Sequence, residues 1–232
     1  MEGTSHMHPR YSFILVLLLL IGLTSVLTAQ TAMTEAPGTA RGGFMLFGGL
    51  ALPAGEFGKT DGDNAGFAKK GFFGGAEIMF SVAPSVGIVL DGRYIMNKFD
   101  DSQIVSAIGN TPGFTHDVGS YIGILPMGGI RLYTTGPIGL FVDGQAGYMF
   151  AKSPEVTVTG PGVNEKVDAV SGNAFAYGAS AGIDIGNTLI VGASYIICKP
   201  KFDIAVTENG HQTTQTAEQP MNMIQVFAGV RF

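Results

Sequence analysis

The chain has 232 residues, and only 13% of them are charged, against roughly 25% in an average soluble domain. Its 35 glycines, 16 phenylalanines and 7 tyrosines suit twisted β-structure and disfavour a helical enzyme, because glycine destabilises helix interiors. The net charge of -5 is spread out with no basic block, which excludes nucleic acid as a partner, and the single Cys198 excludes an intrachain disulfide.

The N-terminal residues have the order of an export signal. Arg10 precedes an apolar run from Tyr11 to Leu23, and small residues follow up to Ala29. This order predicts a cleavable signal peptide over residues 1–29. The alternative is an uncleaved membrane anchor, but the apolar run is short for a spanning helix, which needs about 20 residues. Residues 30–41 are small and polar and predict a flexible lead-in, and residues 42–232 form the predicted β-domain.

From Gly42 onward, apolar and mixed residues alternate with a period of two, which is typical of strands with two different faces. Eight segments show this pattern: about 43–52, 71–82, 86–98, 118–133, 138–152, 173–185, 188–202 and 221–232. In the last segment the apolar face ends on an aromatic residue at Phe232, and the other face includes Gln225 and Arg231. Pro126 lies within the fourth segment and predicts a bulge or a break there, because proline cannot donate to a strand ladder.

Strand length and connection length distinguish a membrane barrel from a soluble sheet. The segments have roughly 10 to 15 residues, whereas strands of globular proteins average about 5 to 6 and tilted transmembrane strands need about 9 to 11. The connections alternate between long and short. The long ones are 53–70, 99–117, 153–172 and 203–220, and the short ones are 83–85, 134–137 and 186–187. Bacterial outer-membrane barrels have this rhythm, with short periplasmic turns and longer outer loops. The pattern predicts an all-β, eight-stranded antiparallel up-and-down transmembrane β-barrel.

These features together resemble the small outer-membrane β-barrels of Gram-negative bacteria, of the OmpA/OmpX type. The likeness rests on the signal-like residues from Arg10 to Ala29, the eight alternating segments, and the apolar positions before the terminal aromatic, which are Val226, Ala228, Val230 and Phe232. The resemblance implies an outer-membrane location, contact with outer-membrane lipid, and recognition of those four residues by the barrel assembly machinery. We expect a monomer. We also expect no periplasmic peptidoglycan-binding domain, because the chain ends at Phe232.

The mixed faces carry charges that would point into the barrel. These residues are Glu77, Asp91, Arg93, Arg131, Asp143, Asp184 and Arg231, with Gln145 and Gln225 among them. Unpaired charges in a confined interior are costly, so we expect a network of ion pairs that fills the barrel. The alternative is a gated, porin-like passive channel lined by the same residues.

An enzyme is the alternative to a structural or channel protein, since some small barrels modify lipids or cleave proteins at the outer rim. His116 and His211 lie in predicted outer loops near Asp117 and Glu208, and Asp100 and Asp101 lie at the start of the second long loop. No Gly-x-Ser-x-Gly elbow and no metal-spaced histidine pair accompanies them. We therefore expect no enzyme activity, no cofactor and no metal. A soluble secreted barrel of the lipocalin type is the last alternative, which so few charges and such long strands disfavour.

Two further expectations concern the surface. The outer loops are polar, without a dense Lys/Arg cluster for lipopolysaccharide phosphates, and we expect them to carry a structural or surface-interaction role, with a surface ligand as their partner. Aromatic residues are candidates for girdles at the membrane interfaces. They are Tyr94, Tyr121, Tyr133, Tyr148, Tyr177, Tyr195, Phe44, Phe72, Phe80, Phe150, Phe175 and Phe232.

Overall fold

The computed structural model describes residues 42–62, 64–108, 113–208 and 211–232. The predicted signal peptide and lead-in lie outside the described residues. Within the described part, no helix is long and apolar enough to cross a membrane.

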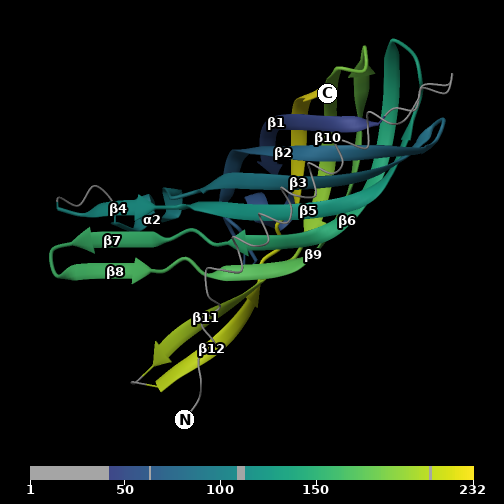
Figure 1. Ribbon diagram of the computed structural model, residues 1–232. Helices are drawn as coiled ribbons and strands as arrows, with labels where there is room; N and C mark the ends of the chain where they lie inside the picture. Colours follow the sequence, from purple (N-terminus) through teal and green to yellow (C-terminus); the bar gives the residue numbers. More distant parts are fainter. Residues whose placement is uncertain (1–41, 63, 109–112, 209–210) are drawn as a thin grey trace. The chain divides into compact units, whose positions relative to one another are not determined.

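Eight strands of the described chain close into one antiparallel barrel (Figure 1). They are β1 (Gly43–Pro53), β2 (Ala68–Ala83), β3 (Val86–Phe99), β5 (Ser120–Tyr133), β6 (Ile138–Lys152), β9 (Ser171–Ile185), β10 (Leu189–Cys198) and β13 (Met223–Arg231). Each pairs with its neighbour in chain order, and β13 closes the barrel by pairing with both β1 and β10. The predicted fold class is confirmed, and the strand bounds differ from the prediction by a few residues at the ends.

The two faces of the barrel wall differ as the alternation predicts. Large apolar side chains point outward and are well exposed, for example Leu90 at 51%, Val142 at 50% and Ile130 at 59%. The alternate residues point inward and are buried, including the charged residues of the strands. Soluble proteins rarely expose a continuous apolar surface of this kind, whereas a barrel in lipid requires one.

Pro126 neither bulges nor breaks its strand, which corrects the prediction for this position. β5 runs without interruption, and Pro126 lies opposite Gly92 of β3 in unbroken register. On the other side, pairing with β6 stops at Ile124 and resumes at Met127 in the same register. The missing N–H of proline therefore removes local pairing with β6 but leaves the direction and register of the strand intact.

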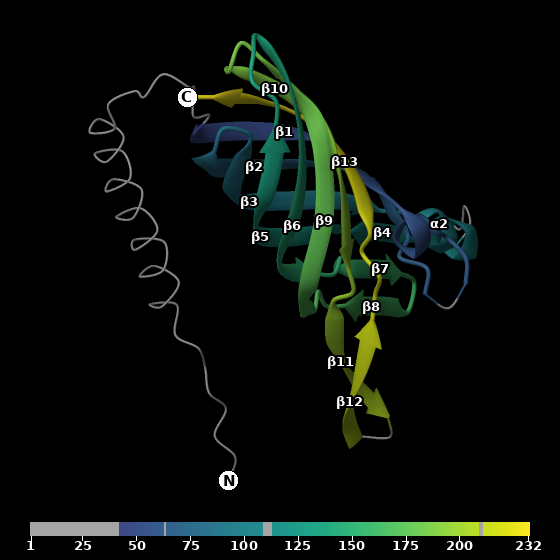
Figure 2. The same cartoon turned by 90° about the vertical axis from the view of Figure 1, so that its right-hand side faces the viewer.

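Three of the four long outer connections contain regular structure where the sequence predicted loops, and the fourth contains a short turn of helix. The additional elements are η1 (Gly55–Gly58), α2 (Ser102–Ile108), β4 (Thr115–Val118), β7 (Val156–Gly160), β8 (Val163–Val167), β11 (Lys201–Glu208) and β12 (His211–Glu218). Strands β4, β7 and β8 form a three-stranded sheet, and β11 pairs with β12 as a hairpin. Figures 1 and 2 show both extensions beyond the ends of the barrel strands. The extensions form because the strands continue their pairing past the barrel, which single-strand patterns do not reveal.

The predicted seventh strand, 188–202, is interrupted once. β10 ends opposite Ala176 of β9, and β11 resumes opposite Asn173 in the same register. Lys199 and the buried Pro200 separate the two strands. Beyond this interruption β11 turns away to pair with β12, so the barrel strand continues into the outer hairpin.

Candidate functional site

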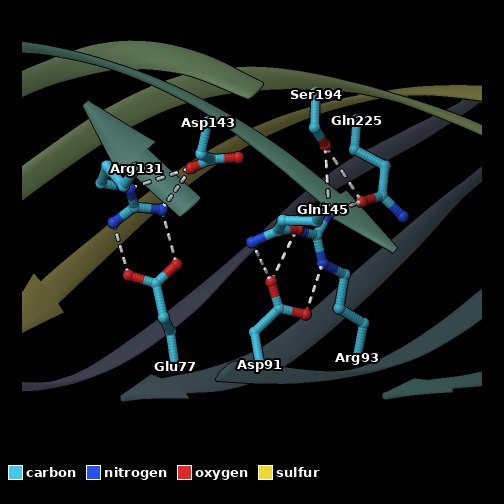
Figure 3. A network of polar contacts seen from close by, with 8 residues as sticks. All are labelled: Glu77, Asp91, Arg93, Arg131, Asp143, Gln145, Ser194 and Gln225. Atoms are coloured by element: carbon cyan, nitrogen blue, oxygen red, sulfur yellow. Dashed lines mark hydrogen bonds and ion pairs between the residues drawn. The ribbon is translucent and has the colours of Figure 1, made fainter. Parts of the chain in front are cut away.

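The first polar cluster of the barrel interior is centred on Arg131 of β5 (Figure 3). Its guanidinium donates to both carboxylate oxygens of Glu77, at 2.5 and 2.7 Å, and to Asp143 Oδ2 from two nitrogens, at 2.6 and 2.9 Å. The ring of Phe141 lies under the guanidinium, with its centroid 4.5 Å from Cζ. All three charged side chains are at most 3% exposed. This cluster links β2, β5 and β6 through one cation.

The second cluster is centred on Arg93 of β3 and lies beside the first (Figure 3). Arg93 pairs with Asp91 of the same strand, Nη2 to Oδ2 at 2.8 Å, and also donates to Gln145 Oε1 at 2.9 Å. Across the barrel, Arg93 also donates to Gln225 Oε1 at 2.6 Å and to Ser194 Oγ at 3.1 Å, on the opposite wall. Because these partners come from β3, β6, β10 and β13, the cluster ties opposite walls of the barrel together.

A third ion pair joins Arg231 and Asp184, both buried, near the short-turn end of the barrel. All seven charged residues that the sequence predicts to face inward therefore lie inside, in these three groups. Asp143 Oδ1 is buried without a hydrogen-bond partner among the described residues, so the packing around the first cluster leaves one carboxylate oxygen unsatisfied.

The outer half of the interior is mainly apolar, although the buried Asn97 also lies there, and this apolar layer was not predicted from the sequence. Its buried side chains include Ile95, Leu125, Met149, Ile196 and Met223. Phe57 of η1 is fully buried as well, and its ring lies edge-on to Tyr121 at a centroid distance of 5.2 Å. Phe57 is one of two phenylalanines in the otherwise polar connection 53–70, and these were the available signal for this contact. Phe57 therefore anchors the first outer connection to the interior.

Many of these inward side chains are almost fully buried inside the barrel. A void beside Arg131, Tyr133 and Arg231 measures about 10 Å³. That is close to the least volume that one water molecule requires, so this space does not form a passage. An eight-stranded barrel is just wide enough for its own side chains, in agreement with this packing.

A charged cluster outside the barrel connects β2 to the second outer connection. Lys69 Nζ lies 3.2 Å from Asp100 Oδ1 and 3.5 Å from Asp101 Oδ1, and the ring of His116 donates to Asp101 Oδ2 at 3.1 Å. The hydrogen bond from His116 and the charge of Lys69 hold the pKa of Asp101 below its usual range. Asp117, the neighbour predicted for His116 from the sequence, follows it in β4, but the ion-pair partner is Asp101. His211 begins β12, with its side chain outside the described residues.

The terminal strand places its predicted assembly residues on the outer surface. Val226 and Val230 are 44% and 42% exposed, and Phe232 is 73% exposed. Among the predicted girdle residues, Tyr121 and Tyr133 are buried inside the barrel, at 8% and 5%, which corrects that assignment. Their parity in β5 places both on the inner face. Phe72, Phe150, Phe175 and Tyr177 lie on the outer face.

Within the described residues, no group of His, Cys, Asp and Glu side chains could hold a metal ion. A closed barrel with an apolar exterior and a charged, packed interior is the architecture of small transmembrane β-barrels. The fold resemblance predicted from the sequence is confirmed at this level.

No protein-family profile matches the chain, and no curated protein matches it either. Solved structures similar to it are small outer-membrane barrels. Ail, the attachment invasion locus protein of Yersinia pestis, has a TM-score of 0.45 and 15% identity over 82% of this chain and 99% of Ail. The outer membrane protein OprG from Pseudomonas aeruginosa has a TM-score of 0.47 and 11% identity, over 85% of this chain and 99% of OprG. AlkL, an outer membrane protein studied in lipid bilayers, has a TM-score of 0.45 and 12% identity, over 86% of this chain and 94% of AlkL.

Proposed function

We propose that the chain is an outer-membrane barrel with a filled, non-conducting interior, exported by a signal peptide that is cleaved after residue 29. The observation that carries this proposal is the inverted polarity of the wall. Apolar side chains such as Leu90 and Val142 face outward, while Arg93 and Arg131 are buried among hydrogen-bond partners. Exposure of these apolar side chains to water would be unfavourable, whereas contact with lipid would stabilise the barrel. The outward-facing Val226, Ala228, Val230 and Phe232 are then available to the assembly machinery.

The packed interior favours a barrel that is plugged by its own side chains over an open channel. Arg131 has its two carboxylate partners within 2.7 Å, and the buried side chains above the charged clusters are mainly apolar, with the Asn97 amide donating to the carbonyls of Ala51 and Lys69. Ion conduction needs a continuous polar or water-filled route. We therefore assign the buried charges a structural role, in which they join neighbouring and opposite strands.

The surface role belongs to the outer extensions in this proposal. The connections 53–70, 99–119, 153–172 and 199–220 hold twelve acidic residues and six lysines, without arginine. Five of the acidic residues lie on the paired strands of the β4–β7–β8 sheet and the β11–β12 hairpin, namely Asp117, Glu165, Asp203, Glu208 and Glu218. Such a surface suits neutral or cationic partners and disfavours polyanions. The chain then has a structural or surface-interaction role and no catalytic one, with the His116–Asp101 pair serving to hold the two ends of the second outer connection together.

Conductance across planar lipid bilayers tests the plug. We expect the refolded wild-type barrel to show no channel openings. Arg131→Ala should then lower stability without creating a stable open state, because the remaining carboxylates lose their cation. Regular single-channel openings of the wild type, or a large stable conductance in a folded Arg131→Ala barrel, would establish the gated channel instead.

A further inference from the structure

A groove of about 440 Å³ lies where β9 passes the interruption between β10 and β11. Its lining includes Tyr148, Phe175, Tyr177, Ile197, Lys199 and Lys201. The groove exists because Pro200 is buried and interrupts the strand for two residues, after which β11 turns outward to pair with β12. Figures 1 and 2 show the β11–β12 hairpin leaving the wall at this point.

One side of the groove is an aromatic wall on the outer face of the barrel. Phe175 is 79% exposed, more than the other large apolar side chains of the described residues. Tyr148 packs edge-on against it at a centroid distance of 5.3 Å, and the Tyr148 hydroxyl donates to Asn173 Oδ1 at 2.7 Å. This hydrogen bond and the contact with Phe175 orient the ring of Tyr148 along the groove. Aromatic side chains with one polar end suit the boundary between acyl chains and headgroups.

The other side of the groove is basic. Lys199 is exposed and has no ion-pair partner within 4 Å among the described residues. Lys201 pairs with Glu218, Nζ to Oε1 at 2.9 Å, with both side chains more than half exposed. The two lysines and one glutamate leave a net positive charge beside the aromatic wall, although the outer connections as a whole are acidic.

We propose that this groove binds a phosphorylated lipid of the outer leaflet, with a phosphate between Lys199 and Lys201 and an acyl chain along Phe175 and Tyr177. The inference rests on the proposed membrane location. Charge complementarity and an adjoining apolar wall match the two parts of such a lipid, and a soluble anion would use only the lysines. The sequence alone gives no dense cluster of basic residues here, because the strand interruption is what assembles the site.

Native mass spectrometry of the purified barrel in detergent tests the proposal, with diphosphorylated lipid A as the probe and its dephosphorylated form as the comparison. We expect a one-to-one adduct with the phosphorylated form, and binding weaker by about tenfold or more for the dephosphorylated form. The double variant Lys199→Gln/Lys201→Gln should lose affinity to a similar degree. Glu218→Gln should bind more tightly, because it removes the negative charge and releases Lys201.

Lys98→Gln is the matched control, since Lys98 is an exposed lysine at the outer end of β3, away from the groove. It should bind as the wild type does. Equal binding of both lipid forms by the wild type, or an equal loss of affinity in Lys98→Gln, would overturn the proposal. Each sample is first checked for compact gel migration without heating. A folded, detergent-dependent barrel that fails to prefer the phosphorylated lipid would therefore refute the groove while leaving the membrane proposal intact.

Discussion

Arg131 is the residue on which the interior depends most, because one guanidinium satisfies two buried carboxylates from different strands. A buried ion pair adds little over an apolar replacement of the whole group, but removal of one partner leaves an uncompensated charge. The sensitivity of this site therefore comes from Glu77 and Asp143, which lose their partner when Arg131 is replaced.

Arg131→Met should lower the free energy of unfolding by about 3–5 kcal/mol, since it leaves Glu77 and Asp143 buried without a cation. Urea unfolding, followed by the gel shift between folded and unfolded forms, measures the change. The triple variant that adds Glu77→Gln and Asp143→Asn should recover most of the loss. Lys98→Met, at an exposed site, should change the free energy by less than about 0.5 kcal/mol. An unchanged midpoint for Arg131→Met would contradict the assigned role.

The sequence predicts which residues face inward but only part of how they pair. Arg131 and Asp143 flank one short turn and lie opposite each other across β5 and β6. Glu77 reaches Arg131 from β2, with β3 between them, and Ser194 and Gln225 reach Arg93 from the far wall. Those contacts depend on the curvature and stagger of the closed barrel, which the alternation within single strands does not encode.

At the scale of elements, close approach of β5 and β6 depends on glycine. A Cβ added to Gly129 would lie 2.0 Å from the carbonyl oxygen of Gly144, so the backbone of one strand would have to move. A Cβ added to Gly144 itself, one residue from the pairing partner of Gly129, would meet no atom within 4 Å. The two glycines thus form a matched pair that differs only in which face they occupy.

Gly129→Ala should destabilise the barrel by about 1–3 kcal/mol, because a methyl group must displace backbone in a packed interior. Gly144→Ala should be neutral or slightly stabilising, since it adds a methyl group to an open outer face. Comparison of the two unfolding midpoints in urea checks this. If Gly129→Ala unfolds at the same urea concentration as the wild type, as Gly144→Ala should, the inward side of this strand pair has room for a methyl group.

The eight barrel strands could be predicted because lipid and the packed interior impose different residue types on alternate positions. The outer extensions could not, since their Thr, Asn and Gln residues occur equally in loops and in solvated strands. Strands β4 and β7 are recognisable only as the continuation of the β5–β6 pairing beyond the barrel. Pro200 could have indicated the interruption between β10 and β11, because proline cannot donate to a strand ladder. Proline alone does not predict such a break, however, since β5 continues through Pro126.

Across the whole molecule, the charged residues are divided between the barrel interior and the outer connections. Seven charged residues are buried in the barrel, and the surplus of acidic residues lies in the outer connections. Like charge on this surface keeps polyanions away and raises the rate of association with cationic partners at low salt.

The folded barrel should therefore pass through an immobilised heparin column without retention at physiological salt. The reason is the twofold excess of acidic residues over lysines in the outer connections. The elution salt concentration is the measured quantity, and a variant with Glu155, Glu165 and Asp168 changed to lysine should be retained. Strong retention of the wild type would show that a local basic surface outweighs the net charge.

The central claim is that the outward apolar face meets lipid. Fractionation of cells that express the full chain, with gels of heated and unheated samples, tests it most directly. We expect recovery in the outer-membrane fraction, extraction only with detergent, and faster migration of the unheated form, because the closed barrel stays compact until it is boiled. Recovery as a soluble periplasmic or secreted protein without detergent would show that this face does not meet lipid.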